Sequence, residues 1–234
     1  MLRTCATASR LAVGLLGLAL LGSGCGTARP SVAGPTGYHG AEPDQVPRRP
    51  SFTLTDTSGA PYDFGRQTAG RPTLLFFGYT HCPDECPTAM ADISAALRAT
   101  GSDVRERTRV VFVTTDPARD DASTLRRWLD TYSPDTVGLS GTQAQVDAAL
   151  ASVGAPAATE AGPQPTLPGQ PGEHVHAPGT APHTHDGPLG YGVQHTNVIF
   201  AFNASDRMPV VYPAGSSPAD IAADLPVLAR KETT

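Results

Sequence analysis

The sequence predicts an α/β fold, in which helices cover a central β-sheet. Short apolar runs typical of buried strands alternate with segments whose apolar residues recur at helical spacing. One apolar run leads directly into a turn that carries two cysteines. Once the Pro/Gly-rich segments at 25–50 and 155–190 are set aside, the remaining chain has the length of one ordinary domain. We therefore expect a single folded unit over 51–230.

In the first half of this unit, a strand is expected over 51–55, where apolar and polar residues alternate. Residues 73–77 are continuously apolar, which indicates a strand buried on both faces. A helix should begin at Pro87 after the cysteine turn, because proline suits the first helical position. Cys86 would then lie at or near the N-cap of that helix.

In the second half, an apolar run over 109–115 predicts the next strand, and Asp120 is expected to cap a helix over 121–132. Residues 155–190 are rich in proline, glycine and histidine, so we expect a disordered insertion before the last strands. The other expected elements are a strand at 137–139, a helix at 142–152, strands at 196–202 and 208–212, and a closing helix at 217–230 that contains Pro226.

The charge pattern argues against a nucleic-acid partner. The chain has 234 residues and a net charge of −5, and Lys231 is its only lysine. No long basic run or basic stripe is present. Proteins that bind nucleic acid normally carry such a feature.

The N-terminal region predicts export. Residues 1–24 have arginines, an apolar run of eleven residues and no acid, which is typical of a signal peptide rather than a membrane span. The segment around Cys25 resembles a bacterial lipobox, although Gly22 stands where that pattern usually has leucine. We expect Cys25 to be lipidated and residues 25–50 to form a flexible linker. The protein would then be extracytoplasmic, anchored to the outer face of the plasma membrane.

Two cysteines, Cys82 and Cys86, remain in the folded part once Cys5 and Cys25 are accounted for. A disulfide between them would close a very small loop and stabilise the fold little. The start of a helix lowers thiol pKa values, so this pair suits redox chemistry or metal binding. Two thiolates suit Cu(I) or Zn(II), and the third ligand could be His195, just before a strand, or His81.

Three segments together resemble the Sco/SenC family: GYTHCPDECP at 78–87, TDPARD at 115–120 and HT at 195–196. The resemblance extends over about 51–230. It implies a thioredoxin-like fold and copper, as Cu(I) or Cu(II), bound by Cys82, Cys86 and His195. It further implies a role in building the binuclear copper A site of cytochrome c oxidase.

Other residues near these motifs are expected to organise the site. Pro83 stiffens the loop between the cysteines, and Asp84 follows it. Asp116 comes at the carboxyl end of its expected strand, on the side of the sheet where α/β proteins place their sites. We expect Pro83, Asp84 and Asp116 to shape or support the site rather than to bind the metal.

The insertion at 155–190 departs from the usual family pattern, which is shorter there. It contains two His-x-His elements, and imidazole pairs of this kind bind Cu(II). They could form an auxiliary copper site, or they could be solvated histidines without consequence. The histidines are His174, His176, His183 and His185.

Two functions remain open from the sequence. The first is a copper chaperone that exchanges metal with the copper A subunit of the oxidase and with another copper chaperone of the periplasmic type. The second is a thiol-disulfide oxidoreductase in which Cys82 and Cys86 are catalytic and reduce the cysteines of a copper-site partner. A peroxidase is disfavoured, because Thr80 lies two residues before Cys82 rather than three.

Overall fold

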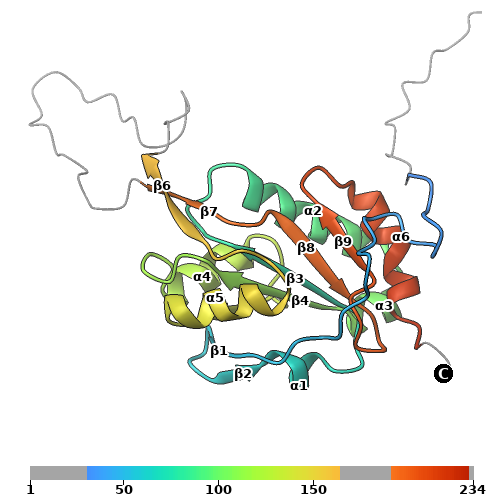
Figure 1. Cartoon of the computed structure of the whole chain (residues 1–234), viewed down its shortest axis with the longest axis horizontal. Coiled ribbons are helices and arrows are strands. Elements are labelled where there is room, and N and C mark those ends of the chain that lie inside the picture. The colour runs from blue at the N-terminus through green and yellow to red at the C-terminus, as the bar shows by residue number, and fades with distance from the viewer. Residues whose placement is uncertain (1–30, 164–190, 232–234) are drawn as a thin grey trace, which may run out of the picture.

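The structure is a computed structural model that describes residues 31–163 and 191–231. Its centre is a seven-stranded sheet in the order β2-β1-β5-β4-β3-β8-β9, flanked by helices on both faces (Figure 1). The strands of this sheet are β1 (Thr53–Asp56), β2 (Pro61–Asp63), β3 (Thr73–Gly78), β4 (Arg109–Thr114), β5 (Val137–Ser140), β8 (Val198–Phe202) and β9 (Val210–Pro213).

A separate two-stranded hairpin joins β6 (Thr159–Pro163) to β7 (Tyr191–Gln194). The helices are α1 (Phe64–Thr68), α2 (Glu85–Ala99), α3 (Ser102–Arg107), α4 (Ala122–Asp130), α5 (Gln143–Ser152) and α6 (Pro218–Leu228). None of the helices in the described ranges is long and apolar enough to cross a membrane.

The core lies in two layers, one on each face of the sheet. Alternate residues of β3 serve opposite layers: Leu74 and Phe76 pack with residues of α2, α4 and α6, whereas Leu75 and Phe77 pack with residues of α5. This confirms the prediction of a strand buried on both faces. Strands β3 and β4 are parallel, so their carboxyl ends meet at one edge, where Gly78 pairs with Thr114.

Two predicted helix starts were wrong. Helix α2 begins at Glu85 with Asp84 at the N-cap, so Cys86 is the second helical residue and Pro87 the third. Proline is tolerated there because the first four N–H groups of a helix have no partner within it. Helix α4 is capped by Asp121, whose carboxylate accepts a hydrogen bond from Thr124 N at 2.7 Å, and not by Asp120.

Strand β2, helices α1 and α3 and the β6–β7 hairpin were not predicted from the sequence. Residues 159–163 were expected to be disordered within the insertion at 155–190, and instead they pair with 191–194. A pairing between two segments far apart in the chain depends on how they meet in space, which local composition does not show. Ala155, also within the expected insertion, is buried and donates its N–H to the Leu150 carbonyl at 3.0 Å, and residues 164–190 lie outside the described residues.

Residues 31–50, called the strap below, are not the flexible linker expected over 25–50. Tyr38 is buried, and Ala41 exchanges two backbone hydrogen bonds with Val211 of β9, at 2.8 and 2.9 Å. The Arg49 side chain is only 3% exposed and donates to the Asp206 carboxylate at 2.8 Å and to the Asn203 carbonyl at 3.0 Å. The low hydrophobicity of residues 31–50 indicated a linker. The contacts that hold the segment are mostly polar, so hydrophobicity did not predict them.

Replacement of Arg49 tests this docking. We expect Arg49→Ala to lower the free energy of unfolding by about 2 to 4 kcal/mol, because it leaves several buried acceptors unpaired. Exposed Arg48 provides a matched control, and Arg48→Ala should change stability by less than about 0.5 kcal/mol. Urea unfolding of both variants measures the difference, and equal effects would show that the strap is not fastened at Arg49.

Candidate metal centre

The two cysteines follow directly from the end of β3. Cys86 is fully buried in the first turn of α2, and Cys82 is partly exposed in the preceding loop. Gly78 makes this approach possible, because a Cβ atom at that position would lie only 2.9 Å from the Cys86 Sγ atom. The strand, the loop and the helix therefore fix where both sulfur atoms lie.

His195 lies between β7 and β8, and it reaches the cysteines. Its Nε2 atom is 3.5 Å from Cys86 Sγ. Its Nδ1 atom contacts the Thr196 carbonyl at 3.2 Å. The ring is thus oriented with Nδ1 toward the backbone and Nε2 toward the sulfur atoms.

Aromatic rings support the imidazole from the side. Tyr79 and Phe76 meet the His195 ring edge to face, with ring centroids 5.7 and 6.3 Å away. Both side chains are buried. They restrict the orientation of the imidazole ring, which a metal ligand needs.

The two thiols differ strongly in acidity. The pKa of Cys82 is lowered to about 4, mainly by a hydrogen bond from the Cys86 thiol, with further contributions from His195 and from backbone N–H groups. The pKa of Cys86 is raised, because this thiol donates to Cys82 and is buried. At neutral pH the metal-free site thus holds one thiolate, Cys82, beside one protonated thiol, Cys86.

These donors fit a soft metal ion by type. Two sulfurs and one imidazole nitrogen are ligands that suit Cu(I) or Zn(II). Among the described residues, no group of three or more His, Cys, Asp and Glu side chains is already set in metal-binding geometry. The three side chains lie instead at hydrogen-bonding distances, and loss of the Cys86 proton would accompany metal binding.

Asp116 organises a cluster next to His195 rather than contacting the sulfurs. It pairs with Arg119 and accepts a hydrogen bond from the Tyr191 hydroxyl at 3.0 Å. Arg119 also donates to the Tyr191 carbonyl at 2.9 Å, and its guanidinium lies 3.9 Å from the centre of the Tyr191 ring. This cluster attaches β7, which leads directly to His195, to the loop after β4.

Buried Asp120 holds the start of the cysteine loop. Its carboxylate accepts from Thr80 N at 2.9 Å and from the Thr114 hydroxyl at 2.6 Å. His81, the rival third ligand, directs Nδ1 toward Thr80 Oγ1 at 3.1 Å and Asp120 at 3.5 Å. The structure therefore brings His195, and not His81, into contact with a cysteine sulfur.

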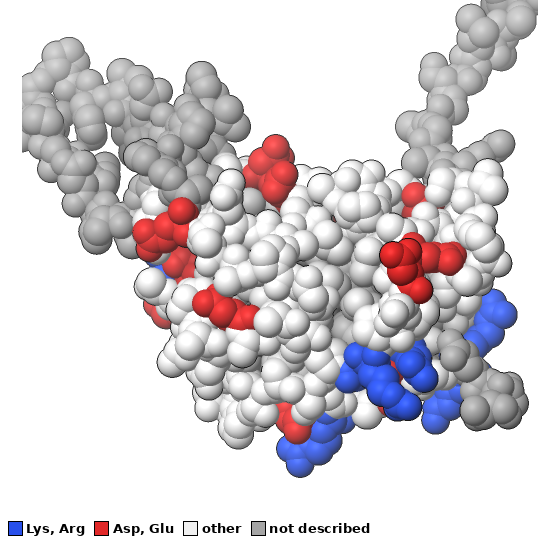
Figure 2. All heavy atoms as spheres, viewed as in Figure 1, with Lys and Arg blue, Asp and Glu red and all other residues white. Residues whose placement is uncertain are grey.

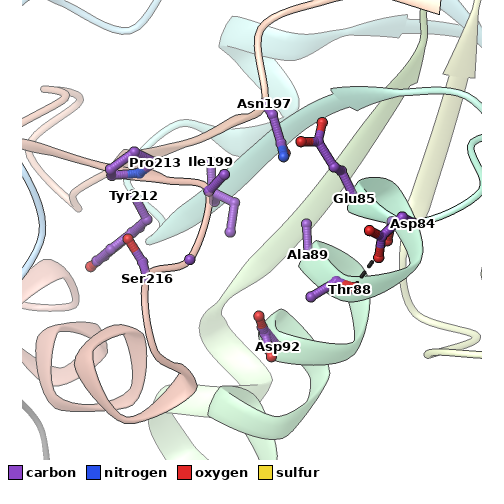
Figure 3. Close-up of a pocket in the computed structure, with 12 residues that line it drawn as sticks. Asp84, Glu85, Thr88, Ala89, Asp92, Asn197, Ile199, Tyr212, Pro213 and Ser216 are labelled. Atoms are coloured by element: carbon purple, nitrogen blue, oxygen red, sulfur yellow. Dashed lines mark hydrogen bonds between the residues drawn. The ribbon is translucent and has the colours of Figure 1, made fainter.

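Two hollows adjoin the site. A cavity of about 400 Å³ is lined by Cys82 and His195, together with Pro83 and Asp84 of the cysteine loop. A second one, of about 180 Å³, lies between the start of α2 and the end of β9, with Asp84, Glu85 and Asp92 on its α2 side (Figure 3). Cys82 and His195 thus face a space that another molecule can enter.

Several residues of this centre were not singled out from the sequence. Gly78, Tyr79 and Arg119 lie inside the two motif segments, so the motifs contained the signal, but their contacts depend on the folded structure. Tyr191 follows the insertion and had no local signal. Cys25 and the four insertion histidines, His174, His176, His183 and His185, lie outside the described residues.

Comparison with known proteins identifies the family. A family model described as SCO1/SenC matches residues 41–170, more than half of the chain. The chain belongs to the SCO1/SenC family. This confirms the resemblance found in the sequence.

The relatives support the fold. Protein SenC of Rhodobacter capsulatus is 39% identical over 102 residues, which are 42% of this chain and 44% of that protein. The chain thus matches about half the length of its curated relatives.

The copper-bound structure of Bradyrhizobium japonicum ScoI has 30% identity and a TM-score of 0.58, and covers 78% of this chain and 99% of that one. Apo Sco1 of Thermus thermophilus has 26% identity and a TM-score of 0.62, covering 82% and 96%. The predicted α/β, thioredoxin-like fold is confirmed.

The acidity of Cys82 can be measured by alkylation of the reduced, metal-free protein. With a pKa of about 4, Cys82 stays a thiolate above pH 6, so its rate with iodoacetamide should change less than about twofold from pH 6 to 9. An ordinary thiol would speed up roughly a hundredfold over that range. In Cys86→Ala the main hydrogen bond is lost and a steep pH dependence should return. A steep dependence in the unmodified protein would contradict the proposed thiolate.

Proposed function

We propose that this protein is a copper chaperone that holds its cargo between Cys82, Cys86 and His195. The observation that carries the proposal is the contact of His195 Nε2 with Cys86 Sγ at 3.5 Å, which joins two segments 109 residues apart. The similar structure of Bradyrhizobium japonicum ScoI, which has copper bound, supports copper as the metal. The ligand types alone would also allow zinc.

The site is suited to binding copper and releasing it to a recipient. Two thiolates and an imidazole give a three-coordinate environment that suits Cu(I), and an added water or weak ligand would accommodate Cu(II). Cys82 and His195 line the cavity of about 400 Å³, whereas Cys86 is buried. A recipient can therefore approach from one side and replace the accessible ligands first.

We place the protein outside the cytoplasm, attached to the outer face of the plasma membrane through lipidated Cys25. Its recipient is the copper A subunit of cytochrome c oxidase, and a second copper chaperone of the periplasmic type supplies the metal. The insertion histidines His174, His176, His183 and His185 would give auxiliary copper binding.

Anaerobic Cu(I) titration of the reduced protein against a chromogenic chelator tests the site. Loss of an outer-shell partner alone typically weakens metal binding 10- to 100-fold, so Cys82→Ser, Cys86→Ser and His195→Ala should each weaken it by about a hundredfold or more. His81→Ala is the matched control and should leave the affinity within about twofold, since its ring faces Thr80 and Asp120.

A variant with all four insertion histidines replaced separates auxiliary copper from the main site. It should keep the high-affinity site and lose only weaker binding. Unchanged stoichiometry and affinity in the Cys82, Cys86 and His195 variants would exclude the proposed centre.

A second function, thiol-disulfide oxidoreductase, is favoured by the unequal thiols. Cys82 is an accessible thiolate, and the Cys86 N–H group donates to its sulfur at 3.3 Å. Cys82 would attack a partner disulfide and release one partner thiolate. Cys86 would then lose its proton and attack Cys82, which releases the second partner thiol and leaves a Cys82–Cys86 disulfide. Two electrons pass to the partner in this exchange.

His195→Ala separates the two functions. A dithiol reductase should keep most of its rate toward an oxidised dithiol peptide in this variant, whereas a copper chaperone should lose copper binding. For a reductase, Cys82→Ser should abolish activity and Cys86→Ser should accumulate a mixed disulfide detectable by intact mass. Absence of that mixed disulfide would argue against the oxidoreductase.

A further inference from the structure

A pair of opposite charges is buried next to the candidate metal centre. Figure 2 shows charged side chains at the surface of the molecule, with Lys and Arg gathered along its lower edge. The side chains of Arg119 and Asp116 are instead only 2% and 3% exposed. A buried ion pair is often no more stabilising than apolar residues of similar size. Stability alone therefore does not account for this pair.

His195 lies in a segment that the main sheet does not hold directly. Strand β7 ends at Gln194 and β8 begins at Val198, so His195 belongs to neither strand. The β6–β7 hairpin that precedes it forms a separate two-stranded sheet. The backbone pair nearest to His195 that joins β8 to β3 is Ile199 with Phe76. The imidazole therefore needs contacts other than strand pairing to stay beside the sulfur atoms.

The Arg119 guanidinium supplies such contacts on two sides of His195. On one side it donates to the Tyr191 carbonyl at 2.9 Å and lies 3.9 Å from the centre of the Tyr191 ring. Tyr191 is the first residue of β7, the strand that leads to His195. On the other side the guanidinium lies 5.5 Å from the centre of the Tyr79 ring, which meets the imidazole edge to face. One side chain thus contacts both the strand before His195 and a ring that packs against it.

The shape of the guanidinium allows these contacts to be made together. Its N–H donors lie around the rim of a flat group, which leaves the two faces free to stack on rings. In Arg119, Nε donates to the Asp116 carboxylate while Nη1 donates to the Tyr191 carbonyl. A lysine ammonium is compact and has no flat face. A lysine at this position could keep the ion pair with Asp116, but it would lose the stacking on the rings.

The two sulfur ligands are held by other parts of the structure. Buried Asp120 fixes the start of the cysteine loop by accepting hydrogen bonds from Thr80 N and from the Thr114 hydroxyl. Cys86 lies within α2. A change at Arg119 should therefore displace the imidazole more than the sulfur atoms.

We propose that Arg119 is the positioning residue of His195. Its buried guanidinium, neutralised by Asp116, holds the start of β7 and the Tyr79 ring so that the imidazole stays beside the two sulfur atoms. Arg119 does not itself bind the metal. The inference rests on the three-ligand copper site proposed above, and it means that Arg119 influences copper affinity only while His195 is present.

Arg119→Lys tests this role, with Arg49→Lys as the matched control. Arg49 is also a buried arginine that pairs with an aspartate and lies over a ring, Phe202, at 5.0 Å. It donates to the Arg71 carbonyl just before β3, at the opposite end of that strand from the cysteines. Partners that orient a metal-binding histidine typically contribute 10- to 100-fold to affinity. In the anaerobic Cu(I) titration, Arg119→Lys should weaken binding about tenfold and Arg49→Lys less than about twofold, while urea unfolding verifies that both variants are folded.

The same substitution in a His195→Ala background separates positioning from a general loss of structure. If Arg119 acts through the imidazole, Arg119→Lys should change the Cu(I) affinity of the His195→Ala protein by less than about twofold. A merely structural role would weaken binding by the same factor in both backgrounds.

NMR of the reduced, metal-free protein gives a second readout. Nuclear Overhauser contacts between the ring protons of Tyr79 and His195 should be present in the unmodified protein and in Arg49→Lys. They should be lost or strongly weakened in Arg119→Lys. Tyr191→Leu, which removes the stacked ring and its hydroxyl but keeps the buried ion pair, should act in the same direction.

Two results would overturn the proposal. One is an Arg119→Lys protein that keeps full Cu(I) affinity and the contacts between Tyr79 and His195. The other is equal weakening of Cu(I) binding in the two backgrounds. Equal affinity of the unmodified protein and His195→Ala would instead refute the three-ligand site, and the NMR contacts, which need no metal, would still decide whether Arg119 positions the imidazole.

Discussion

The antiparallel pairing of β8 with β3 is the constraint on which the metal centre depends. Phe76 pairs with Ile199 and Thr73 with Phe202, so the start of β8 lies beside the end of β3. His195 comes just before β8, and the cysteine loop comes just after β3. A shift of one residue in this register would turn every side chain of β8 to the other face of the sheet. The buried side chains on both faces therefore fix the position of the imidazole relative to the sulfurs.

His195 must keep its position beside the cysteines although a long insertion precedes it in the chain. Loop-closure entropy grows only slowly with loop length, by about 0.6 kcal/mol for each doubling, so the fold tolerates a long connection before His195. A ligand that follows such a connection needs contacts of its own to hold its position. The β6–β7 hairpin and the Asp116–Arg119–Tyr191 cluster lie between the insertion and His195. They isolate the ligand from the chain that precedes it.

The unequal acidity of the two thiols links copper binding to redox chemistry. One hydrogen bond, from the Cys86 thiol to the Cys82 thiolate, lowers the pKa of Cys82 and raises that of Cys86. A soft metal ion and an electrophilic disulfide would both react first with the accessible thiolate. Metal binding and thiol-disulfide exchange then both require Cys86 to lose its proton. The same geometry therefore serves either function, and His195 distinguishes them because only metal binding needs an imidazole ligand.

The sequence by itself determined the fold class, the buried strand 73–77, the cysteine pair and the family to which the chain belongs. These features are local, since they depend on the spacing of apolar residues and on short motifs. The contact of His195 with Cys86 was expected from the family resemblance, whereas residue spacing left His81 as a rival. Only the tertiary structure decided that His81 turns to Asp120, that Arg119 binds Tyr191 and that residues 31–50 dock along β9 and α6. Each of these depends on polar groups that lie far apart in the chain and meet only after the sheet has formed, so no local pattern records them.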